Sequence, residues 1–114
     1  MLLQIVERHI EPDITVVELS GTLALGQEAQ RIEDLIEDLV KKGSRRIVLD
    51  MGGVGHIDSA GIGMVALASG RLREAGGKLA VVAPDGRVLQ ILNQTQMSTI
   101  VTVCGTVDGA VASV

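Results

Sequence analysis

The sequence predicts an α/β domain in which a mixed, mostly parallel β-sheet is wound with about four helices. Segments rich in Val, Ile and Leu alternate along the chain with segments whose apolar residues recur at helical spacing. Alternating strands and helices are typical of βαβ units with right-handed crossovers. The chain has 114 residues, which suits one domain over 1–114 with a radius of gyration of about 13 Å.

The composition argues against several classes of partner. The chain has no Phe, Tyr or Trp and a net charge of −4, so it lacks both the stacking platforms and the positive charge of nucleic-acid sites. No apolar run approaches the roughly 20 residues of a membrane helix, and we expect no membrane insertion. The single Cys104 cannot form an internal disulfide, which favours a cytoplasmic location.

The first half of the chain is expected to hold two adjacent strands, or a hairpin, followed by an amphipathic helix. The apolar stripe of that helix ends before Lys41 and Lys42, and Gly43 follows as the expected C′ residue. The predicted elements are a strand from about Leu3 to the turn at Glu11–Asp13, a strand over 14–19, a short loop over 22–26 and a helix over 29–42.

The centre of the sequence is the segment RIVLDMGGVGHIDSAGIG, residues 46–63. Its uninterrupted apolar run 47–49 predicts a strand that is buried on both faces. The glycines at 52, 53 and 55 predict a turn after this strand. Ser59 is a favoured N-cap residue type and is expected to cap a helix that starts at Ala60.

The remaining chain continues the alternation of strands and helices. The helix that begins at Ala60 is expected to end near Gly76-Gly77. The predicted elements beyond it are a strand over 78–83, a turn at 84–86, a short helix around 88–92, a strand over 99–103 and a weak terminal helix over 107–114.

The motifs of common enzymes and metal sites do not fit this sequence. A nucleophile elbow needs glycine two residues before the serine, where Ile57 stands. After Gly76-Gly77-Lys78, a P-loop needs Ser or Thr, but Leu79 follows. The candidate metal ligands that lack suitable spacing are His9, His56 and Cys104. The sequence therefore predicts a protein that is not an enzyme and that needs no metal or cofactor.

Two interpretations of Ser59 follow from its position. It is either a helix cap alone or a hydroxyl that another protein modifies. A helix N-terminus tolerates a phosphate, so modification need not disrupt the fold. The glycines at 61 and 63 suit either the close approach of a partner or close packing on the sheet.

Residues 46–84 resemble the heart of a STAS domain, and specifically the anti-sigma factor antagonists of the sporulation stage II AA type. The matching pattern is an apolar strand ending in Asp50, the motif Asp58-Ser59-x-Gly61-x-Gly63, an apolar helix, a Gly-Gly turn and an apolar strand. The resemblance extends over nearly all of the chain.

The resemblance implies that Ser59 is phosphorylated by an anti-sigma factor that is also a serine kinase. The unphosphorylated protein would bind that partner and free a sigma factor, and a PP2C-type phosphatase would reset the cycle. It implies a cytoplasmic binding module, monomeric or weakly dimeric. The expected partner-binding residues are Thr22, Leu23, Ala24, Leu25, Asp58, Ala60, Gly61, Ile62, Gly63 and Met64.

The chain departs from the family pattern at one position. The family often has an acidic residue after the second strand, in a Gly-x-Leu-Asp pattern, whereas this sequence has Gly21-Thr22-Leu23-Ala24. A STAS subunit of a stressosome-like scaffold, or one accessory to a lipid or anion transporter, is therefore an alternative without a phosphorylation cycle.

Overall fold

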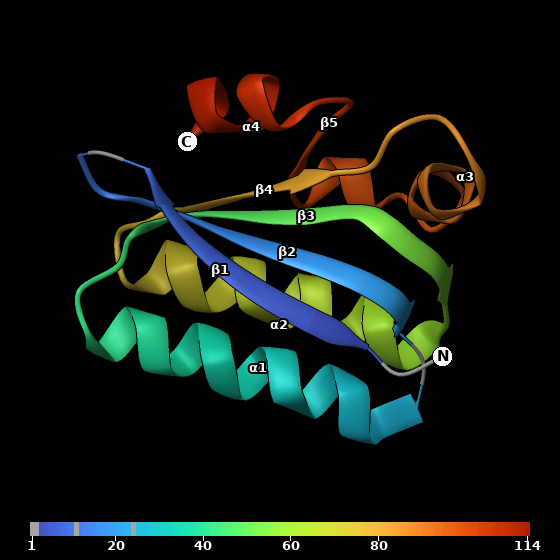
Figure 1. Ribbon diagram of the computed structural model, residues 1–114, viewed down its shortest axis with the longest axis horizontal. Helices are drawn as coiled ribbons and strands as arrows, with labels where there is room; N and C mark the ends of the chain where they lie inside the picture. Colours follow the sequence, from blue (N-terminus) through green and yellow to red (C-terminus); the bar gives the residue numbers. More distant parts are fainter. Residues whose placement is uncertain (1–2, 11, 24) are drawn as a thin grey trace.

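A five-stranded mixed sheet forms the middle of the molecule (Figure 1). The computed structural model describes residues 3–10, 12–23 and 25–114. Its elements are β1 (Gln4–Ile10), β2 (Ile14–Leu23), α1 (Leu25–Lys41), β3 (Arg46–Ile57), α2 (Ser59–Glu74), β4 (Lys78–Val82), α3 (Arg87–Gln94), a 3₁₀ turn (Met97–Thr99), β5 (Thr102–Cys104) and α4 (Val107–Ser113). β1 and β2 pair antiparallel and the other pairs are parallel, which confirms the predicted mixed sheet.

The helices cover the two faces of the sheet unequally. α1 and α2 lie side by side on one face and α4 lies on the other (Figure 1). α1 and α2 connect successive parallel strands on the same face, so their crossovers have the same hand. The main core lies between these helices and the sheet, and Val88 and Leu92 of α3 extend it. A smaller core under α4 contains Ile14, Val16, Val48, Ala80, Val82 and Ala110.

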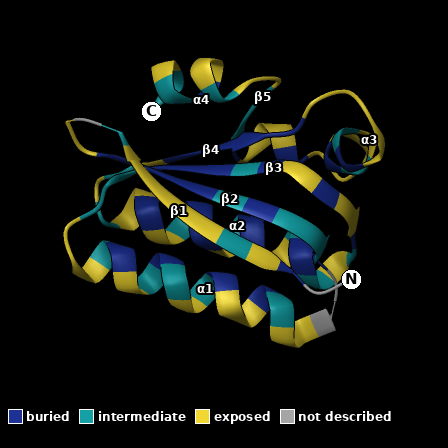
Figure 2. Ribbon diagram, in the orientation of Figure 1, coloured by how far each residue is buried: buried dark blue, intermediate teal, exposed yellow. Residues whose placement is uncertain are grey.

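Burial is concentrated in the three middle strands. Figure 2 shows β2 and β4 largely buried, and β3 buried in its first part, whereas the edge strand β1 is largely exposed. Val, Ile, Leu, Met and Ala fill the core, as the absence of aromatic residues requires. The radius of gyration is 12.5 Å, close to the value expected for a compact chain of this length.

Both strands that lead to the Ser59 region are longer than predicted. β3 continues through Gly52, Gly53 and Gly55 to Ile57, so the predicted glycine turn is wrong. β2 continues to Leu23 and α1 begins at Leu25, so the loop predicted over 22–26 is also wrong, in its first two and its last two residues. The two strands pair with each other along this extension, with two shifts of register, and that pairing keeps the glycine-rich segment extended.

The end of α1 agrees with the prediction. Gly43 has φ +98°, the left-handed conformation that favours glycine at C′, and the Ser44 N–H donates to Leu39 O at 2.9 Å. On the outer face, Lys42 lies 2.9 Å from Asp38. The hydrogen bond that Lys42 donates to the Asp38 carboxylate raises the pKa of Lys42.

The last strand is shorter and later than predicted. A 3₁₀ turn over Met97–Thr99 includes the first residue of the strand predicted over 99–103. β5 begins only at Thr102, where it pairs with Ala80. The predicted weak terminal helix is present as α4. In the part of the chain that the structure describes, no helix is long and apolar enough to cross a membrane.

The two faces of α2 should respond differently to truncation. Leu72 is fully buried, whereas Leu67 on the same helix is 55% exposed. We expect Leu72→Ala to lower the free energy of unfolding by about 2–5 kcal/mol because it leaves a cavity. The matched change Leu67→Ala should stay within about 0.5 kcal/mol of wild type. Urea melts measure both, and equal losses would contradict the described packing of α2.

Candidate functional site

The candidate site lies where β2 and β3 end side by side and α2 begins. The final strand pairs are Thr22 with His56 and Leu23 with Ile57. The N–H of Asp58 donates to Leu23 O at 3.3 Å, so the first residue after β3 is tied to the last residue of β2. The structure thus brings the two sequence-predicted segments together at one end of the sheet.

Asp58, and not Ser59, is the N-cap of α2. Asp58 has an extended backbone conformation, and its Oδ1 atom accepts a hydrogen bond from the Gly61 N–H at 3.1 Å. The N–H of Ile62 donates to Asp58 O at 3.0 Å, the first turn of the helix. The prediction that Ser59 caps the helix is therefore wrong, because the chain turns into the helix one residue earlier.

Ser59 is consequently the first helical residue, and it is exposed. Within the described residues its hydroxyl makes no hydrogen bond. The carboxylate of Asp58 caps the helix, so the Ser59 hydroxyl is not needed to stabilise the first turn. An exposed hydroxyl at a helix N-terminus is chemically suited to carry a phosphate.

The two glycines after Ser59 have different roles. A Cβ atom on Gly61 would lie 2.7 Å from Cγ1 of Ile57 and 2.9 Å from Leu23 O, so Gly61 is needed for close packing. A Cβ atom on Gly63 would meet nothing within 4 Å. Of the two interpretations left open by the sequence, close packing on the sheet is confirmed for Gly61, whereas Gly63 faces open space and the approach of a partner there stays a prediction.

The predicted partner-binding residues divide by exposure. Leu23, Gly61 and Met64 are buried, and the side chains of Leu23 and Met64 lie in the core, so contact of these three residues with a partner stays a prediction. Ala24 and the side chain of Leu25 lie outside the described residues. The predicted residues that reach the surface fully or partly are Thr22, Asp58, Ala60, Ile62 and Gly63.

Two surface features escaped the sequence analysis. Leu67 is 55% exposed and lies four residues after Gly63 and eight after Ser59, which places all three on one face of α2. That spacing was a usable signal. A shallow hollow of ≈ 200 Å³ lies nearby, lined by Gly21, Thr22, Gly53 and Gly55. These glycines looked like a turn in the sequence, which concealed their place on paired strands.

The chemistry of the site is that of a surface rather than of an enclosed reaction centre. Among the described residues, no three His, Cys, Asp or Glu side chains gather as a metal site, and no buried side-chain polar atom lacks a hydrogen-bond partner. The exposed hydroxyl, the open glycine and the exposed leucine lie on one helix face at the surface of an α/β domain.

The chain belongs to the STAS domain family, whose profile matches residues 6–110. Its homology places it among the anti-sigma factor antagonists, which are non-enzymatic regulators. It is 31% identical over 85 residues to the Bordetella bronchiseptica protein named "Putative anti-sigma factor antagonist BtrV", a match covering 75% of this chain and 73% of that protein.

Solved structures share the fold at lower identity. An anti-sigma factor antagonist from Mycobacterium paratuberculosis superposes with a TM-score of 0.88 at 21% identity, covering 99% of this chain and 94% of that one. The Bacillus protein SpoIIAA superposes in its unphosphorylated form with a TM-score of 0.74 at 14% identity, covering 96% of both chains. Its phosphorylated form gives 0.73 at 16% identity, covering 96% of this chain and 98% of that one.

The glycine pair gives a direct test of the site geometry. We expect Gly61→Ala to destabilise the protein by about 1–3 kcal/mol, because the new methyl group would overlap Ile57 and the Leu23 carbonyl. Gly63→Ala should stabilise it by up to about 1 kcal/mol, because alanine favours a helix and the space is open. Chemical denaturation of both variants checks this. The same sign for the two changes would argue against the described approach of α2 to the sheet.

The assignment of the cap makes a second prediction. Asp58→Ala should cost about 1 kcal/mol of stability, because Gly61 N–H loses its acceptor. Asp58→Asn keeps a capping oxygen and should recover most of that loss. Ser59→Ala should change the unfolding free energy by less than about 0.5 kcal/mol. Thermal melts of the three variants would refute the assignment if Ser59→Ala were the most destabilised.

Proposed function

We propose that this protein is an anti-sigma factor antagonist whose binding to an anti-sigma factor is switched off by phosphorylation of Ser59. The observation that carries the proposal is that Ser59 is exposed at the first position of α2 while Asp58 supplies the cap. The hydroxyl can thus be modified without removing a contact that holds the helix.

The local electrostatics favour a phosphate at this position. α2 is 16 residues long, and the partial positive charge of its N-terminus favours an added phosphate. The Asp58 carboxylate already accepts one of the N–H groups there, from Gly61. A phosphate on Ser59 would add about −1.5 to −2 charges at pH 7. SpoIIAA, which shares this fold, has been solved in phosphorylated and unphosphorylated forms, which supports a fold that survives the modification.

The same charge would oppose binding of the partner. Ser59 shares its helix face with Gly63 and Leu67, an open and partly apolar surface. A partner that covers this face must remove water from the phosphate, and a buried charge without a counter-charge is costly. The neighbouring Asp58 carboxylate adds repulsion rather than compensation. In this proposal the partner is a cytoplasmic anti-sigma factor with serine kinase activity, and a PP2C-type phosphatase reverses the modification.

The acceptor site can be mapped directly. After incubation with the cognate kinase and ATP, we expect one phosphate per chain and its location on Ser59 by phosphopeptide mass spectrometry. Ser59→Ala should abolish incorporation, whereas the control Ser98→Ala, which removes another exposed serine, should leave it unchanged. A dominant phosphate on any other residue would overturn the proposal.

Binding should then separate two substitutions that leave the fold intact. Ser59→Ala should bind the anti-sigma factor about as tightly as wild type, and Ser59→Asp should bind at least about tenfold more weakly because it places a charge on the partner face. Isothermal titration with the unmodified proteins measures this difference. Equal affinities would favour a scaffold or transporter-accessory role in which Ser59 is not a switch.

A further inference from the structure

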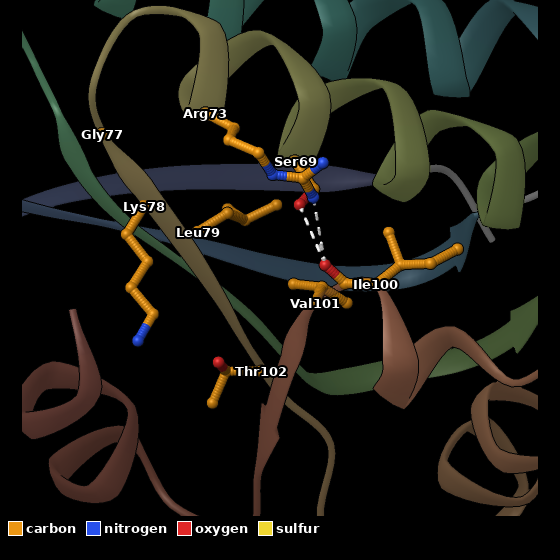
Figure 3. A pocket seen from close by; sticks show the side chains of 8 residues that line it. All are labelled: Ser69, Arg73, Gly77, Lys78, Leu79, Ile100, Val101 and Thr102. Carbon is orange, nitrogen blue, oxygen red and sulfur yellow. Dashed lines mark hydrogen bonds between the residues drawn. The ribbon is translucent and has the colours of Figure 1, made fainter.

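A second surface lies at the opposite end of α2 from Ser59. It is a groove of ≈ 230 Å³ between the second half of α2, the start of β4 and the chain that enters β5 (Figure 3). Ser59 and Arg73 are fourteen residues apart on this helix, a separation of about 21 Å at the rise of an α-helix. The groove is therefore distinct from the proposed switch. Its lining residues are Ser69, Arg73, Gly77, Lys78, Leu79, Ile100, Val101 and Thr102.

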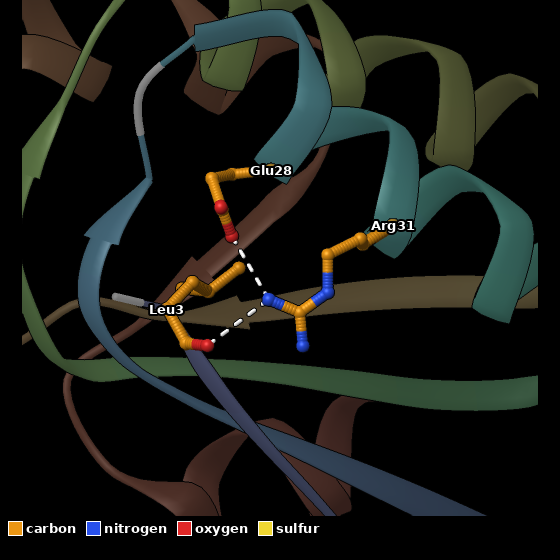
Figure 4. A network of polar contacts seen from close by, with 3 residues as sticks. All are labelled: Leu3, Glu28 and Arg31. Atoms are coloured by element: carbon orange, nitrogen blue, oxygen red, sulfur yellow. Dashed lines mark hydrogen bonds and ion pairs between the residues drawn. The ribbon is translucent and has the colours of Figure 1, made fainter.

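The charged side chains that line the groove are both cationic, although the chain has a net charge of −4. Of the ten lysines and arginines of the chain, six lie elsewhere on the described surface within 4.0 Å of a carboxylate. Arg31 is an example, held by Glu28 at 2.9 Å and by the Leu3 carbonyl at 3.1 Å (Figure 4). Arg73 and Lys78 have no such carboxylate among the described residues.

The intramolecular contacts of Arg73 are weak. Its guanidinium donates to the Ile100 carbonyl at 3.5 Å, and the Ser69 hydroxyl donates to the same oxygen at 3.4 Å (Figure 3). Both distances are at the outer limit of a hydrogen bond. A guanidinium has five N–H donors, so Arg73 retains donors for a carboxylate, with which arginine forms paired hydrogen bonds.

The two cations lie on opposite sides of β4. Lys78 and Leu79 are adjacent in this strand and point to opposite faces, and Arg73 lies on the α2 side (Figure 3). β5 pairs with β4 only from Ala80 to Val82, so the first two residues of β4 have no β5 neighbour. The groove thus opens at the start of β4, before its pairing with β5 begins.

The groove also has an apolar component. Leu79 and Val101 are buried at 3% and 4% exposure and form its floor, while Ile100 is 44% exposed at its rim. Lys78 can be explained separately as a solvated surface lysine, and Arg73 as an arginine in the last turn of a helix, where a positive charge is favourable. They do not explain an exposed isoleucine at the rim of a groove that two cations without a described carboxylate partner line.

We propose that this groove binds an extended acidic segment of a partner protein. Neighbouring residues of an extended segment point to opposite faces. Two adjacent acidic residues can therefore approach Arg73 and Lys78 from the two sides of β4, while an apolar neighbour covers Ile100. A small anion on one face reaches one cation only. The site is independent of Ser59, so this inference does not rest on the proposed switch.

A peptide probe tests the site on the whole protein. The probe is the hexapeptide Ac-Ala-Val-Glu-Glu-Val-Ala-amide, and its neutral match carries Gln-Gln in place of Glu-Glu. In a ¹⁵N–¹H titration at about 50 mM salt, we expect the acidic peptide to shift the amide signals of Arg73, Leu79 and Thr102. The neutral peptide should bind at least about tenfold more weakly, and added salt should weaken the acidic one.

Charge reversal provides the matched controls. The double variant Arg73→Glu/Lys78→Glu should lose the binding of the acidic peptide. Arg87→Glu, which reverses another arginine that has no carboxylate partner among the described residues, should retain it. Ser59→Asp should bind the acidic peptide as tightly as wild type does. A negative result for the groove can therefore be distinguished from a negative result for the proposed phosphorylation switch. The proposal is overturned if the acidic peptide causes no shifts at millimolar concentration, shifts residues elsewhere, or binds the double variant equally well.

Discussion

The close approach of the first turn of α2 to the end of β2 is the contact on which the site depends. The Leu23 carbonyl accepts the Asp58 N–H and lies 2.9 Å from the position of a Cβ atom on Gly61. Only a residue without a side chain allows the helix to start at this depth. Because the helix is held there, Ser59 is directed outward while Met64 and Val65 are directed into the core.

α2 therefore has one face that packs in the core and stabilises the fold, and another that is exposed at the surface. One face of the helix carries Ala68 and Leu72 into the main core, and the other leaves Ser59 and Leu67 at the surface. A charge added to Ser59 changes the second face and leaves the packing of the first. This separation is what a modifiable binding module requires, since a switch that unfolded the domain would lose the surface that it controls.

The order of elements could be predicted because buried strands and amphipathic helices leave strong hydrophobic patterns. The extent of β3 could not, because its glycines have poor local strand propensity and only pairing with β2 keeps them extended. Asp58 and Ser59 are both good capping residues, so the choice between them depends on where the backbone enters the helix. The burial of Met64 was accessible from its spacing to the buried Ala68 and Leu72.

The central claim is that phosphorylation at Ser59 changes recognition without changing the fold. The most direct measurement compares the unmodified protein with the protein phosphorylated stoichiometrically at Ser59, by titrating each into the anti-sigma factor and by recording the free energy of unfolding of each. The account predicts that affinity falls by at least about tenfold while the unfolding free energy stays within about 1 kcal/mol. Unchanged affinity, or a loss of affinity accompanied by unfolding, would contradict it.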